Sequence, residues 1–119
     1  MRDVLNKRSA EVVGRRQRKP QDFLPDPSRH HVQYQALHSF KHESVRLEKW
    51  QANQTIELEN LGGIELLVLE GKFNHNNTEY RKFDWLRLPI GHSLRASIEK
   101  DTCKVWIKTG HHLHQIKDK

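Results

Sequence analysis

The sequence predicts an all-β protein with one domain, built as a small barrel of short antiparallel strands. Short segments alternate apolar and polar residues, and turn residues separate these segments at intervals of about 8 to 12 residues. No window carries the long periodicity of an amphipathic helix. A length of 119 residues, of which 34% are hydrophobic, suits a single core.

The expected strands follow one another from residue 32 onward. Alternation predicts strands in five segments: residues 32–36, 45–47, 83–88, 94–98 and 105–107. Residues 64–69 (IELLVL) form a more continuous run, which is typical of a strand covered on both faces. Turn residues stand between these segments, at residues 60–63, 74–79, 89–91, 99–101 and 110. We therefore expect about seven strands in this chain.

Charge divides the chain into unequal parts. Residues 1–20 carry seven basic and two acidic side chains, whereas the rest carries 14 basic and 13 acidic ones. We predict a basic, poorly ordered tail and linker over residues 1–22, the folded domain over 23–115 and a C-terminal tail over 116–119. The isoelectric point of 9.7 thus reflects the N-terminal tail. That tail has no aromatic side chain for base stacking, so nucleic acid is not an expected partner.

Cysteine content and hydropathy exclude several classes of protein. The single cysteine, Cys103, cannot form an intramolecular disulfide or a cysteine-based zinc cluster, and we expect it to be a buried, inert thiol. No apolar run approaches the roughly 20 residues that span a bilayer, and the first residues lack the apolar stretch of a signal peptide. The expected location is the cytoplasm, with no membrane partner.

Three motifs lie in order between residues 62 and 112: GGIELLVLEGKF, YRKFDWLRLPIG and CKVWIKTGHH. Together they resemble the ChrR-type cupin family of RmlC-like cupin domains. The resemblance covers about half of the chain closely and extends weakly back to Phe23. It implies a double-stranded β-helix, the jelly-roll barrel. The chain is most similar to the second domain of tandem ChrR-like cupin proteins.

The resemblance also implies where metal ligands would stand. Cupins usually bind a divalent metal through histidines and a carboxylate that point into the barrel mouth. Counting from Gly71 and Pro89 places these positions on four residues: Leu58, Asn60, Ile64 and Leu94. A shift of one residue would bring Glu57 and Glu59 to the histidine positions and would leave the last two positions apolar.

Leucine and isoleucine offer no lone pair, and an asparagine amide is a poor ligand for zinc or iron. We therefore expect no metal at these positions and no resident cofactor. Apolar and aromatic side chains are expected to line the pocket at the barrel mouth instead: Leu58, Ile64, Trp85 and Leu94.

Two functions of different classes remain open. The first is a non-enzymatic module with no catalytic residues, which binds a ligand or a protein or associates with itself. A homodimer is expected, because a lone half of a tandem pair leaves a sheet face exposed. The second is a metal-dependent cupin enzyme, such as a dioxygenase, with a relocated zinc, iron or manganese site. That site would be built from His92, His111 and a carboxylate.

Anti-sigma activity is not expected. In ChrR-type anti-sigma factors a separate zinc-binding domain precedes the cupin and holds the sigma factor. Residues 1–20 are too few to supply such a domain and contain no cysteine or histidine.

Overall fold

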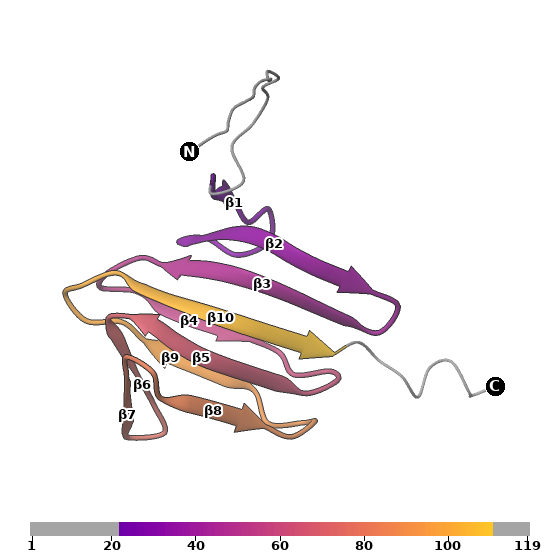
Figure 1. Ribbon diagram of the computed structural model, residues 1–119. Helices are drawn as coiled ribbons and strands as arrows, with labels where there is room; N and C mark the ends of the chain where they lie inside the picture. The colour runs from indigo at the N-terminus through magenta and orange to yellow at the C-terminus, as the bar shows by residue number, and fades with distance from the viewer. Residues whose placement is uncertain (1–21, 111–119) are drawn as a thin grey trace, which may run out of the picture.

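The computed structural model describes residues 22–110, which form ten β-strands and no helix (Figure 1). The all-β prediction is confirmed. The expected N-terminal tail, apart from Asp22, and residues 111–119 lie outside the described part of the chain. Within that part there is no helix long and apolar enough to cross a membrane.

The strands form two antiparallel sheets, which we call the large sheet and the small sheet (Figure 1). The large sheet has the order β1 (Leu24–Pro25), β2 (Val32–Phe40), β3 (Glu43–Trp50), β10 (Cys103–Gly110), β5 (Ile64–Glu70), β8 (Trp85–Leu88). The small sheet has the order β4 (Thr55–Leu58), β9 (Leu94–Ser97), β6 (Lys72–His75), β7 (Thr78–Arg81).

Alternation along each strand separates a buried inner face from an outer face. On β10, Cys103, Val105 and Ile107 are buried, whereas the residues between them are only half-buried. Residues of both sheets join one apolar core, in which Trp50 contacts Phe73 edge to face at 5.4 Å between ring centroids. The core therefore lies between the two sheets.

The continuous apolar run of β5 differs from its prediction. Ile64, Leu66 and Val68 are buried, but Leu67 and Leu69 lie half-buried on the outer face of the large sheet. The small sheet covers only one face of β5, so only that face is fully closed. This leaves apolar side chains on the outer surface.

Four strands were not expected from the sequence: β1, β4, β6 and β7. Residues 74–79 were expected to form one long turn, but they belong mostly to the hairpin of β6 and β7. Asn76 and Asn77 alone make the connection, with φ of 51° and 63°. Two consecutive left-handed residues are typical of a type I′ turn, in which asparagine is favoured.

The turn between β5 and β6 explains one glycine of the sequence motifs. Gly71 has a φ of 75°, and a Cβ there would lie 2.6 Å from the carbonyl oxygen of Thr102. A larger residue would be strained and would push against backbone.

A buried ion-pair network closes the inner face of β3. Glu48 is 1% exposed and accepts hydrogen bonds from Arg29 at 2.6 Å and from Trp50 Nε1 at 2.9 Å. Asp26 accepts hydrogen bonds from Arg29 at 3.1 Å and from Arg46 at 2.8 Å. Two carboxylates and two guanidinium groups thus hold the segment before β2 against strand β3.

Candidate functional site

The apolar residues at the expected ligand positions lie in or against the core. Ile64 and Leu94 are each 1% exposed, and half-buried Leu58 packs against the same cluster. Leu58 and Leu94 are direct partners on β4 and β9. They also line a small surface pocket of about 360 Å³ beside the ion pair of Glu57 and Arg95.

Asn60 has a structural role that sequence analysis missed. Its side chain is buried, and Nδ2 lies within 3.0 Å of the carbonyl oxygens of Leu88, Pro89 and His92. Its Oδ1 accepts a hydrogen bond from the Gly63 amide at 2.7 Å. The amide therefore holds the turn after β8 against the turn before β5.

These residues do not fit a divalent metal ion. Such an ion needs several converging imidazole, thiolate or carboxylate ligands. Between residues 22 and 110, no three histidine, cysteine, aspartate or glutamate side chains lie close enough to hold one. His92 is exposed in the turn after Pro89, and His111 lies outside the described residues. The relocated site therefore stays a hypothesis.

His75 and Cys103 are buried. His75 falls within residues 74–79, which were expected to form a turn, but it lies on the inner face of β6 and is 5% exposed. Its Nδ1 accepts a hydrogen bond from the Arg95 amide at 3.3 Å. Burial raises the pKa of the Cys103 thiol to about 12, which agrees with the expected inert thiol.

Trp85 does not lie where the sequence analysis placed it. It was expected to line the barrel mouth, but it is 51% exposed on the outer face of the large sheet. Leu86 and Leu88 take the inward positions of β8, and alternation turns Trp85 outward. Its ring stacks on that of Trp106, with 5.7 Å between the centroids.

Four residues on the outer face form what we call the aromatic stripe. They are direct cross-strand partners on β3, β10, β5 and β8: Leu47, Trp106, Leu67 and Trp85. All four are half-buried or exposed. Two ion pairs lie on the same face. Lys108 Nζ is 3.8 Å from Glu43 Oε1, and Arg87 Nε is 3.3 Å from Glu65 Oε2. The outer face thus presents an apolar stripe with ion pairs along one side.

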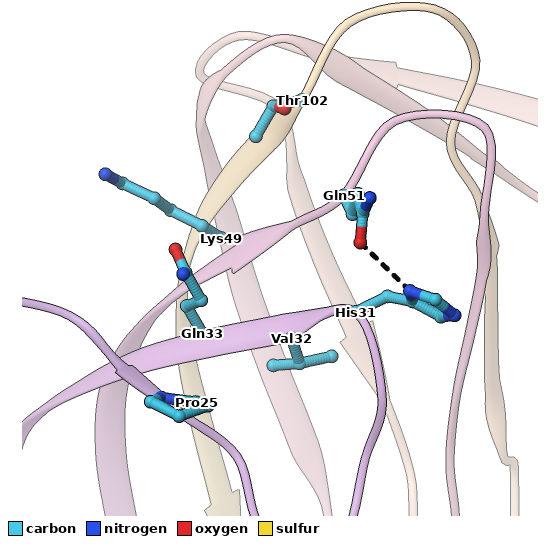
Figure 2. Close-up of a pocket in the computed structure, with 7 residues that line it drawn as sticks. All are labelled: Pro25, His31, Val32, Gln33, Lys49, Gln51 and Thr102. Atoms are coloured by element: carbon cyan, nitrogen blue, oxygen red, sulfur yellow. Dashed lines mark hydrogen bonds between the residues drawn. The ribbon is translucent and has the colours of Figure 1, made fainter.

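A polar pocket of about 600 Å³ lies where β3 ends and β10 begins (Figure 2). It is lined by seven residues: Pro25, His31, Val32, Gln33, Lys49, Gln51 and Thr102. His31 Nδ1 and Gln51 Oε1 are joined by a hydrogen bond of 2.9 Å. None of these seven residues was singled out as a site residue from the sequence.

Comparison with known proteins identifies the fold. No protein-family model matches the sequence, and no curated protein sequence matches it. Solved structures do match: the anti-sigma factor ChrR of Rhodobacter sphaeroides, in complex with SigE, has a TM-score of 0.60 at 19% identity. That match covers 66% of this chain and 44% of the ChrR chain.

Two further structures extend the comparison. An RmlC-like cupin protein of Ralstonia eutropha JMP134 has a TM-score of 0.65 at 10% identity, over 76% of this chain and 63% of that one. An acetylacetone dioxygenase of Acinetobacter johnsonii has a TM-score of 0.66 at 10% identity, over 87% and 78%. This chain spans less than two thirds of the ChrR chain and of the RmlC-like cupin protein.

The chain therefore has the RmlC-like cupin fold, as its resemblance to ChrR-type cupins predicts. Identities this low show the fold and not the activity. The same fold serves an anti-sigma factor and a dioxygenase among these neighbours.

Proposed function

We propose that this protein is a non-enzymatic cupin module that acts by binding protein, and that its aromatic stripe associates with the same stripe of a second copy. The observation that supports this proposal is the aromatic stripe on the outer face of the large sheet. Large aromatic residues that stay partly exposed on a sheet face are typical of interfaces, where tryptophan is a frequent anchor. Here two stacked tryptophans lie on the outer face, Trp106 on the inner strand β10 and Trp85 on the edge strand β8.

The surroundings of the stripe support a second copy as the occupant. Residues 22–110 contain twelve basic and twelve acidic side chains, so two copies of this part do not repel each other through net charge. The ion pairs at the border place both signs of charge on the same face. A two-fold interface needs such a self-complementary face, with an apolar centre and a polar rim.

The dimer is tested by the oligomeric state of the full chain. Sedimentation at increasing protein concentration is expected to give a dimer for the wild type and a monomer for Trp85→Lys. The dimer dissociation constant should rise at least about 30-fold, the effect of removing a hot-spot residue. Phe83→Lys is the matched control, because Phe83 is an exposed aromatic residue outside the stripe. A monomeric wild type, or equal dimerisation of both variants, would refute the proposal.

We also propose that the module carries no resident metal. Metal analysis of untagged protein, purified without chelators, should give less than about one-tenth of an equivalent of zinc, iron or manganese. A variant without His111, His112 and His114 controls for binding by the histidine-rich end. Nearly one equivalent in both proteins would make the enzyme hypothesis the leading one.

A further inference from the structure

We propose that Lys49 and Lys104, together with the polar pocket beside Lys49, form a binding site for a small molecule that carries a carboxylate or phosphate group. This site goes beyond the proposed self-association and does not depend on it. It lies at one end of the outer face of the large sheet, where β3 ends and β10 begins.

The two lysines are direct cross-strand partners. Lys49 on β3 and Lys104 on β10 are paired in register, and both side chains are half-buried on the outer face. Their Nζ atoms lie 4.3 Å and 5.8 Å from the ring centroid of Phe23. Like charges that stand directly opposite each other destabilise a sheet. The shared aromatic ring holds both ammonium groups in the same small region.

Neither lysine has a carboxylate partner among residues 22–110. Lys72 and Lys108 each lie within 4.0 Å of a carboxylate, but Lys49 and Lys104 do not. Glu70 is the register partner of Lys104 on β5, yet its exposed side chain forms no ion pair with it within 4.0 Å. Within the described part of the protein, neither ammonium group is therefore held in an ion pair.

The pocket beside Lys49 offers hydrogen-bond donors and no acidic side chain (Figure 2). Gln33, Gln51 and Thr102 supply amide and hydroxyl groups around it. Because the Oε1 atom of Gln51 can only accept, His31 Nδ1 must donate in the bond between them. The amide NH₂ of Gln51 is then left to donate to another group.

The backbone at the edge of the pocket is held in an uncommon conformation. His31 has a φ of 69°, in the left-handed region that few non-glycine residues adopt. Its carbonyl oxygen accepts a hydrogen bond from the Gln51 amide at 3.0 Å, which fixes the two residues together. Strained residues of this kind collect at binding sites, where they hold donors in place before a ligand arrives.

These features define the class of ligand. Two ammonium groups and several neutral donors match the oxygen atoms of a carboxylate or a phosphate. A volume of about 600 Å³ lies within the range of pockets that hold small molecules. The shared chemistry is an oxyanion on a small molecule, and its source is decided by experiment.

Calorimetric titration of the full chain, with inorganic phosphate in one arm and succinate in the other, tests the site at constant ionic strength. We expect saturable binding with one site per chain in at least one arm, and the tighter arm identifies the anionic group. Lys49→Gln should weaken binding at least about tenfold, the usual effect of losing a charged hydrogen bond.

Lys108→Gln is the matched control, because Lys108 lies on the same face of β10 and makes its own ion pair with Glu43. Its affinity should stay within about twofold of the wild type, whose site it leaves intact. Lack of saturation in both arms would overturn the proposal, because it means that no specific site binds the anion. Equal loss of affinity in both variants would also overturn it, because it indicates a general effect of charge. Retained binding by monomeric Trp85→Lys would separate this site from the dimer interface.

Discussion

Glu48 and Lys49 are neighbours on β3, yet their charges have opposite surroundings. Glu48 points inward, is 1% exposed and meets two arginines and an indole N–H. Lys49 points outward and faces another lysine, with no carboxylate within 4.0 Å in the described part of the chain. The charge of Glu48 is therefore matched on the inner face, whereas Lys49 forms no ion pair on the outer face within the described residues.

The two faces differ because the free-energy cost of an unmatched charge depends on how deeply it is buried. A buried charge without a partner costs several kcal/mol, so the inner network can persist only if its charges are matched. On a partly exposed face, an unmatched pair costs only about 0.2–1 kcal/mol. The outer face therefore tolerates charges and aromatic residues that stability does not require, and these are the features we assign to binding.

Glu48→Ala should produce the largest change in stability. It removes the nearer counter-charge of Arg29, at 2.6 Å against 3.1 Å for Asp26, and leaves Arg46 paired with Asp26 alone. The free energy of unfolding should fall by about 3–5 kcal/mol, measured by urea denaturation. Glu70→Ala, at an exposed position, should change it by less than about 0.5 kcal/mol. Equal losses of unfolding free energy in the two variants would mean that the ion-pair network stabilises the fold no more than an exposed surface charge does.

The same network predicts a loss of stability in acid. Burial by itself would raise the pKa of Asp26, but hydrogen bonds from Arg46 and Ser28 hold that pKa well below its usual range. A carboxyl group with a lowered pKa stabilises the folded state above pH 4 and loses this contribution as the pH falls. Asp26→Asn should therefore lose about 1–3 kcal/mol at pH 7.

The pH dependence distinguishes charge from packing in this variant. Unfolding of wild type and Asp26→Asn is compared by thermal denaturation between pH 7 and pH 2. The difference between the two proteins should shrink steadily below pH 4, because wild-type Asp26 then becomes protonated on unfolding. A difference that stays constant with pH would assign the role of Asp26 to neutral hydrogen bonding.

Local sequence patterns predicted those parts of the fold that depend on neighbours in sequence. The alternation in β2, β3, β9 and β10, and the motifs around Gly71 and Pro89, gave the strands and the cupin fold. The hairpin of β6 and β7 was missed, because its polar residues hide a short strand on each side of Asn76. The inner role of His75 was missed for the same reason.

The candidate sites depend on contacts that no local pattern shows. Lys49 and Lys104 are 55 positions apart and meet only because β3 and β10 pair in one particular register. Trp85 was expected to line the pocket, although alternation with Leu86 and Leu88 turns it to the outer face. Which of the two alternating sets of β8 side chains faces the core depends on how the strand pairs with β5, and only the assembled sheets determine that pairing.

The smallest expected effect tests the idea that the lysine pair is kept for binding. Lys49→Glu places a carboxylate opposite Lys104, turning a repulsive cross-strand pair into an attractive one, and its other register partner, Gln33, is uncharged. Stability should rise by about 0.2–1 kcal/mol in urea denaturation, while affinity for the anion found by calorimetry should fall. Lys49→Gln, which only removes the charge, should lie between the two proteins in stability. If Lys49→Glu were destabilised, the pair would not be a liability in this sheet, and its conflict of like charges would no longer argue for a ligand.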